Sequence, residues 1–172
     1  MDTGLLILRL AVGLLFVGHG TQKLFGWWRG YGLKGTGGFF ESLGYRPGLF
    51  WALVAGSTET VGGLLVGSGF LTPLGAAMII GVMVNAIATV KAPMGLWKGY
   101  ELDLLHALAA AALAFTGPGA YALQRFVDLD LTGGWYGVGA VALGLVVGLL
   151  TLALRRVPRP AAVAETGQPQ AA

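Results

Sequence analysis

Long runs of apolar residues, separated by short polar segments, form the main pattern of this chain. Five runs approach the roughly 20 residues that a helix needs to cross the hydrocarbon core of a membrane. They cover residues 5–25, 49–71, 74–90, 102–116 and 134–154. The fourth run is short and starts with Asp103 and His106. It must therefore be tilted, extended into the headgroups or shielded inside a bundle.

The pattern predicts an all-α membrane protein, a four-helix transmembrane bundle with a fifth, C-terminal transmembrane helix. Residues 1–120 form the four-helix domain, residues 121–157 hold a loop and the fifth span, and residues 158–172 form a disordered cytoplasmic tail. The segment TGGFFESLG, after the first span, is typical of a short helix that lies in the membrane interface. Asp2 precedes the first run and HGTQK follows it, so we expect this run to be retained rather than cleaved as a signal peptide.

Composition agrees with this class. Of the 172 residues, 55% are hydrophobic and 11% are charged, which is less than half of the roughly 25% usual for soluble domains. The chain has no cysteine, which excludes disulfides, iron-sulfur ligation, thiolate zinc sites and anchoring through acylated cysteine. We expect no resident metal. The net charge of +3 belongs to loops, so it indicates orientation in a lipid bilayer and not nucleic-acid binding.

The basic residues predict the orientation. If five helices cross, the two termini lie on opposite faces of the membrane. With the N-terminus outside and the C-terminus inside, the outer loops carry only Arg125, and the inner loops carry Arg29, Lys34, Arg46, Lys91, Lys98, Arg155, Arg156 and Arg159. Positive charge accumulates on the cytoplasmic side, so the chain is predicted to be N-out and C-in.

Small residues recur at helical spacing in two spans. Ala52, Gly56, Gly63 and Gly67 share one face of the second, and Ala140, Gly144 and Gly148 share one face of the fifth. Such stripes let helix backbones approach closely, which is how helices pack in lipid. They predict a compact bundle and not a phosphate-binding loop.

Polar side chains interrupt the predicted spans at positions that share a bundle interior. In the first span Arg9, His19 and Lys23 lie within an arc of roughly 80° at 100° per residue. Glu59 lies on the glycine stripe of the second span and therefore points into the bundle. Burying a charge costs about 2.5 to 3.5 kcal/mol even on mild scales, so each needs a partner or a purpose. We expect a polar pocket in the inner half of the bundle, lined by Arg9, His19, Gln22, Lys23, Glu59, Asn85, Glu101 and His106.

Each of these residues also has a structural interpretation. Arg9 and Glu59 could form a buried ion pair, and Lys23 could reach up to the headgroups. Asn85 and Thr89, four residues apart, could hydrogen-bond across helices. Glu101 and Asp103 could cap the fourth span at its positive end. The two histidines are harder to explain structurally, because each can carry a proton, bind a ligand or ligate a metal.

Several motifs together resemble one known family. The runs LRLAVGLLFVGHGTQKLFG, GTGGFFESLGYRP, LVAGSTETVGGLLVGSGFLTPLGA and GYELDLLHALAAAALAFTGPG are similar, in this order, to the DoxX family of small bacterial integral membrane proteins. The resemblance covers about residues 5–120. It implies a four-helix bundle in the bacterial inner (plasma) membrane and a link to redox chemistry. Relatives include a subunit of a thiosulfate:quinone oxidoreductase and a protein assembled with superoxide dismutase and a sulfurtransferase for thiol homeostasis.

We therefore expect a redox-associated membrane subunit that binds a quinone or a small sulfur-containing species and works with a soluble oxidoreductase partner. Glu59 and His19 are the expected catalytic residues. The sequence leaves the cofactor open, and a quinone is one candidate. A b-type haem on His19 and His106 is the least favoured choice. The alternatives are a non-enzymatic anchor or scaffold for redox enzymes and a small-solute permease. Under each of these functions the chain could form a homo-oligomer.

Overall fold

The computed structural model describes residues 1–156, and every regular element in that part of the chain is a helix. The α-helices are α1 Asp2–Phe25, α2 Gly32–Ser42, α3 Gly48–Ser68, α4 Thr72–Ala86, α5 Glu101–Thr116 and α6 Gly134–Ala153. Short helical turns of other types cover Trp27–Arg29, Ile87–Lys91, Ala92–Met94, Leu96–Tyr100 and Leu123–Val127. The predicted tail, residues 158–172, lies outside the described residues.

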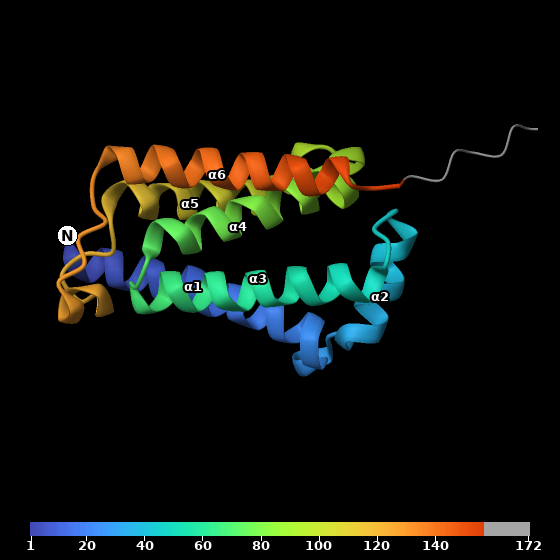
Figure 1. Ribbon diagram of the computed structural model, residues 1–172, viewed down its shortest axis with the longest axis horizontal. Helices are drawn as coiled ribbons and strands as arrows, with labels where there is room; N and C mark the ends of the chain where they lie inside the picture. Colours follow the sequence, from blue (N-terminus) through green and yellow to red (C-terminus); the bar gives the residue numbers. More distant parts are fainter. Residues whose placement is uncertain (157–172) are drawn as a thin grey trace, which may run out of the picture.

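The helices form two layers (Figure 1). One layer contains α1 and α3, and the other contains α4, α5 and α6; the α3–α4 hairpin joins them. Helix α2 lies across one end of the bundle, opposite the end where the chain begins. The last residues of α6 reach this same end, where the amide of Arg156 donates to the carbonyl of Gly44 (2.8 Å). We call this the α2 end, and the opposite one the N-terminal end.

Four helices are long and apolar enough to cross a membrane, and they confirm four of the predicted spans. They cover Asp2–Phe25, Gly48–Ser68, Thr72–Met94 and Gly134–Ala153. The fourth predicted span is present as α5, but its 16 residues extend only about 24 Å, against a hydrocarbon core of about 30 Å. A complete set of five crossings, and a position of α2 in the membrane interface, stay predictions.

Glycine allows the helices of each layer to approach closely, as their spacing predicted. A β-carbon at Gly13 would lie 2.6 Å from the carbonyl oxygen of Gly63, so a side chain cannot fit between α1 and α3. A β-carbon at Gly144 would lie 2.8 Å from the carbonyl oxygen of Ala77, between α6 and α4. These contacts bring backbones together without any help from hydrophobic exclusion, which lipid does not provide.

The apolar core lies between the layers. Its fully buried members include Phe16 of α1, Val66 of α3, Ile79 of α4 and Leu113 of α5. Outward-facing leucines and valines of α1, α3, α5 and α6 stay exposed, as expected for surfaces that face lipid rather than water.

Candidate functional site

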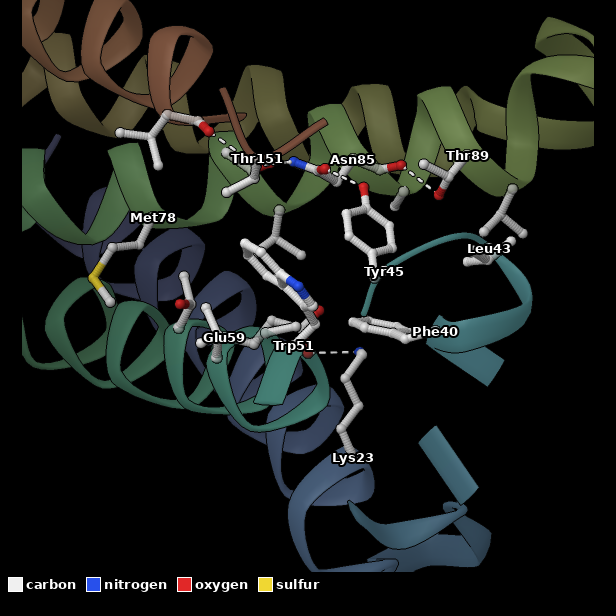
Figure 2. A pocket seen from close by; sticks show the side chains of 18 of the residues that line it. Lys23, Phe40, Leu43, Tyr45, Trp51, Glu59, Met78, Asn85, Thr89 and Thr151 are labelled. Atoms are coloured by element: carbon white, nitrogen blue, oxygen red, sulfur yellow. Dashed lines mark hydrogen bonds and ion pairs between the residues drawn. The ribbon is translucent and has the colours of Figure 1, made fainter. Parts of the chain in front are cut away.

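A cavity of about 390 Å³ lies between the two layers at the α2 end (Figure 2). Side chains of α3 form one wall, those of α4 and α6 form the other, and α2 with the α2–α3 loop covers the end. Lys23 reaches it from the last turns of α1. Most of its surface is apolar, with a few polar groups on both walls, which is the usual composition of a small-molecule site. We call it the central cavity.

An ion pair on the α3 wall is the most strongly polar feature of the central cavity. Lys23 Nζ lies 2.6 Å from Glu59 Oε2, and the dashed line in Figure 2 marks this contact. The side chain of Glu59 is 3% exposed and that of Lys23 is 25% exposed. The interpretation of Lys23 as a headgroup-seeking side chain is therefore wrong, because its ammonium group turns inward to a buried carboxylate.

The contact between α1 and α3 explains why these two residues meet. A β-carbon at Gly20 would lie 2.5 Å from the carbonyl oxygen of Gly56, so the two backbones touch at this level. Lys23 and Glu59 lie three residues beyond these glycines, on nearly the same faces. Because α1 and α3 run antiparallel, the two positions are offset by about 9 Å along the helix axes, and the long side chain of Lys23 spans this offset to reach Glu59. Gly26, in a left-handed conformation (φ 76°), ends α1 directly after this turn.

Arg9 does not pair with Glu59, and that interpretation of the sequence is wrong. Arg9 is 2% exposed and lies toward the N-terminal end, where its Nη2 donates to the carbonyl of Tyr121. Arg9 and Lys23 are about 21 Å apart along α1, so one carboxylate cannot reach both. The structure thus gives Arg9 a contact with the loop before α6, not with the central cavity.

Asn85 lines the opposite wall and is the centre of a hydrogen-bond network. The Tyr45 hydroxyl donates to Asn85 Oδ1 (2.5 Å), and Asn85 Nδ2 donates to Thr151 Oγ1 (2.8 Å) and to the carbonyl of Gly148 (2.9 Å). Thr89 Oγ1 donates to the Asn85 carbonyl (2.7 Å). The predicted cross-helix hydrogen bonding of Asn85 is confirmed, and it joins α4 to α6 and to the α2–α3 loop.

Three aromatic rings, Phe40, Tyr45 and Trp51, line the cavity at the α2 end and were not identified from the sequence as part of the site. The centroids of Phe40 and Tyr45 lie 5.7 Å apart, as do those of Tyr45 and Trp51. Arg155 covers the other side, with its guanidinium carbon 5.7 Å from the Tyr45 ring centroid and its Nε donating to the Leu43 carbonyl (2.8 Å). Burial raises the pKa of the Tyr45 phenol and the Arg155 charge lowers it, burial having the larger effect. Tyr45 therefore stays a neutral donor at physiological pH.

The two histidines do not line the central cavity. Both lie edge-on against the fully buried ring of Phe16, with centroid distances of 6.2 Å for His19 and 5.5 Å for His106. His19 is exposed on α1 and His106 is half-buried on α5. The structure thus places both histidines against one ring of α1, near the contact between α1 and α5, and not in the central cavity with Glu59.

Two other predicted ligand-binding residues also lie outside the central cavity. Gln22 Nε2 donates to the carbonyl of Trp28 (3.5 Å) and so holds the turn after α1. Glu101 is exposed in the first turn of α5, the position at which a carboxylate favours a helix N-terminus. Within residues 1–156, no three His, Asp or Glu side chains come together in a way that could hold a metal ion.

These features define a class: a helical integral membrane protein with a ligand-sized cavity between two helical layers. The DoxX family model matches residues 4–92, and the chain belongs to this family. It is 34% identical over 126 residues to the protein named "Putative oxidoreductase CatD" of Bacillus subtilis (strain 168), covering 73% of this chain and 88% of that protein.

A second relative is the "Uncharacterized membrane protein Rv3486" of Mycobacterium tuberculosis (strain ATCC 25618 / H37Rv), 32% identical over 131 residues. This match covers 69% of the chain and 77% of the relative. No solved structure matches the chain. The family match ends in the region of α4 and its following turns, so α6, which forms part of the cavity wall, lies beyond it.

Proposed function

We propose that this protein is a redox-associated membrane subunit that binds a quinone or a small sulfur-containing species in the central cavity. A soluble oxidoreductase partner supplies the electrons. The observation that carries the proposal is the buried Lys23–Glu59 ion pair on the wall of an otherwise apolar cavity. A charged pair inside a membrane bundle is costly and is by default a functional feature. The name of the Bacillus subtilis relative, an oxidoreductase, supports the same direction.

The size and lining of the cavity suit a planar redox molecule. Its volume of about 390 Å³ falls within the range of about 300 to 1,000 Å³ typical of small-molecule sites. Trp51 and Phe40 offer flat apolar surfaces on which a ring can stack. Tyr45, Thr89 and Thr151 place hydroxyl groups at the same end. The cavity therefore combines stacking surfaces with hydrogen-bonding groups.

Glu59 and Lys23 are assigned the chemical roles in this proposal. Reduction of a quinone to a hydroquinone takes two electrons, from the partner, and two protons, which must reach the carbonyl oxygens. Glu59 is placed to pass protons, and Lys23 supplies positive charge that favours a reduced, anionic ligand. Because His19 lies outside the cavity, the proposal gives it no contact with the ligand.

The test is to identify what the protein carries. The wild type is purified in mild detergent, and its organic extract is analysed by absorption and mass spectrometry. We expect a stoichiometric quinone or sulfur compound, reduced at least tenfold in the Lys23→Met/Glu59→Gln double variant. Asp128→Asn is the matched control, since Asp128 is exposed in a distant loop and asparagine tolerates its left-handed backbone (φ 49°).

Two results would contradict the proposal. A ligand retained fully by a folded double variant would show that the ion pair does not form the binding wall. A wild-type extract that contains phospholipid alone would favour the scaffold function.

Exposed Lys34, Arg46 and Arg156 at the α2 end support that second function, because they could recruit an acidic soluble enzyme. In that case Lys34→Glu/Arg46→Glu loses the partner and the double variant of the ion pair keeps it.

A further inference from the structure

The central cavity is open on one side. Leu143 and Val147 of α6 line it and are nevertheless 47% and 46% exposed, and Leu74 of α4 is 44% exposed. Leu143 is the midpoint of α6, a helix able to cross the membrane. The opening therefore lies at the depth of the hydrocarbon core and faces lipid, not the water on either side.

The opening follows the seam between α3 and α6. Helix α3 packs on α1, α2 and α4, and α6 packs on α4 and α5, so α4 alone forms the floor between them. Trp51, Val54 and Thr58 line the α3 side of the cavity, facing Leu143, Val147 and Thr151 on the α6 side. A molecule moving sideways in the bilayer can thus enter between these two helices.

Polarity changes along this seam. The hydroxyl groups of Tyr45, Thr89 and Thr151 and the amide of Asn85 gather at the α2 end. Toward the N-terminal end of the bundle, Leu143 lies about 12 Å from Thr151 along α6, and Leu74 lies about 16 Å from Asn85 along α4. That end of the cavity contains apolar side chains, including Met78. The cavity is polar at one end and hydrocarbon-like at the other.

The polar end also coincides with basic side chains. Arg155 stacks on Tyr45, and Arg46 and Arg156 are exposed beside it. Basic and aromatic residues mark the headgroup level of a membrane. A ligand with its head at Tyr45 and its apolar part toward Leu143 would therefore lie in the protein as a lipid lies in the bilayer.

From these observations we infer that the ligand of the central cavity is an amphiphile with a hydrocarbon tail, which enters from the bilayer between α3 and α6. Its head occupies the end lined by Lys23, Tyr45 and Asn85, and its tail leaves past Leu143 into lipid. The inference rests on the proposed function and narrows it, because a tail-less, water-soluble sulfur compound does not need this lateral opening.

The first experiment tests the opening without reference to the ligand's head. The four exposed tryptophans, Trp27, Trp28, Trp97 and Trp135, are replaced by phenylalanine, which leaves Trp51 inside the cavity. The protein is reconstituted in phosphatidylcholine with brominated acyl chains. We expect bromine to quench Trp51, and Val147→Phe to reduce the quenching at least twofold.

Val146→Phe is the matched control. Val146 has the same side chain, is 53% exposed and is the neighbour of Val147, but it does not line the cavity. It should leave the quenching unchanged. If Trp51 is quenched by aqueous iodide and not by the brominated chains, the cavity opens to water and the inference is wrong, whatever the protein binds.

The second experiment separates this inference from the proposed function. Nanodiscs with wild-type protein receive a naphthoquinone with an isoprenoid tail or tail-less 2-methylnaphthoquinone, and binding is expressed per mole of lipid. We expect the tailed quinone to bind at least tenfold more tightly, and Val147→Phe to abolish this preference. Equal binding of both overturns the tail assignment. Binding of neither overturns the quinone function, and the Trp51 measurement still decides whether the opening is lateral.

Discussion

At the scale of single residues, the pairing of Glu59 decides what the cavity can do. A carboxylate that is 3% exposed keeps its charge inside a membrane bundle only with a close cation, and Lys23 lies 2.6 Å away. The side chain of Lys23, in turn, is 25% exposed at the surface of the protein. The pair is therefore a charged group that a ligand or a proton can reach, unlike Arg9, which is closed in by the loop before α6.

Removing one member of this pair should destabilise the fold more than removing both. Lys23→Met leaves a buried, unpaired carboxylate, which costs about 3 to 5 kcal/mol for a fully buried pair and less here because Lys23 is partly exposed. We expect Lys23→Met/Glu59→Gln to recover most of the loss. Unfolding in mixed detergent micelles measures the difference. Lys98 is exposed, so Lys98→Met is the control, and its free energy of unfolding should stay within about 0.5 kcal/mol of the wild type. If Lys23→Met changed the free energy of unfolding as little as this control does, the ion pair would not stabilise the fold.

Tyr45 should make the stability of the protein depend on pH in the alkaline range. Burial raises the pKa of its phenol above the usual value of about 10. The folded state disfavours the phenolate. The contribution of the neutral Tyr45 phenol to the free energy of unfolding is therefore complete below about pH 10, and it declines as the pH rises beyond that value. Unfolding measured from pH 8 to 12 should show this decline in the wild type and not in Tyr45→Phe. Identical alkaline profiles would mean that Tyr45 ionises normally.

At the scale of elements, glycine contacts fix how far each helix slides along its neighbour. The contacts of Gly13 with Gly63 and of Gly20 with Gly56 set the register of α1 on α3 and so bring Lys23 to Glu59. At the other wall, the end of α6 is tied to the α2–α3 loop by Arg155 and Arg156, which closes the polar end of the cavity. The geometry of the cavity thus depends on the register of α1 on α3 and on the contact between α6 and the α2–α3 loop.

A β-carbon at Gly13 should separate α1 from α3. The alanine methyl group would lie 2.6 Å from two backbone atoms of α3, so Gly13→Ala should cost about 1 to 3 kcal/mol or more. Gly139 on α6 has nothing within 4 Å of the same position, so Gly139→Ala should be neutral or stabilising by up to about 1 kcal/mol. Thermal unfolding in detergent compares the two, and a neutral Gly13→Ala would contradict the close packing.

At the scale of the whole molecule, charge is distributed between the two ends. The loops at the α2 end carry the basic residues from Arg29 to Lys98 together with Arg155 and Arg156, and the N-terminal end carries Asp2, Arg125, Asp128 and Asp130. From this asymmetry we predict that the α2 end, and with it the polar end of the cavity, faces the cytoplasm. A soluble partner would then meet the protein beside Lys23 and Tyr45.

The absence of cysteine makes this orientation directly measurable. Lys98→Cys and Asp128→Cys flank α5, and each introduces a single thiol. In intact cells a membrane-impermeant maleimide should label Asp128→Cys at once and Lys98→Cys only after permeabilisation. Labelling of both from the same side would mean that α5, with its 16 residues, does not cross. Labelling of Lys98→Cys alone in intact cells would show that the orientation is the opposite of the predicted one.

The sequence by itself determined the class of protein, four membrane-spanning helices and the family. These depend on apolar run length, glycine spacing and local motifs, all of which are properties of one segment at a time. It also identified Glu59, Lys23 and Asn85 as polar groups that face the bundle interior, because helical phase follows from residue number. In each case the information lies within a single helix.

The tertiary structure alone decided which groups meet. Helical phase places Arg9, His19 and Lys23 on the same side of α1, but pairing with Glu59 depends on the axial register of α1 against α3, which the backbone contacts of glycine set. The aromatic wall of Phe40, Tyr45 and Trp51 combines α2, a loop and α3, so no single segment contains its pattern. Register and assembly arise from packing between helices, and a one-dimensional pattern does not contain them.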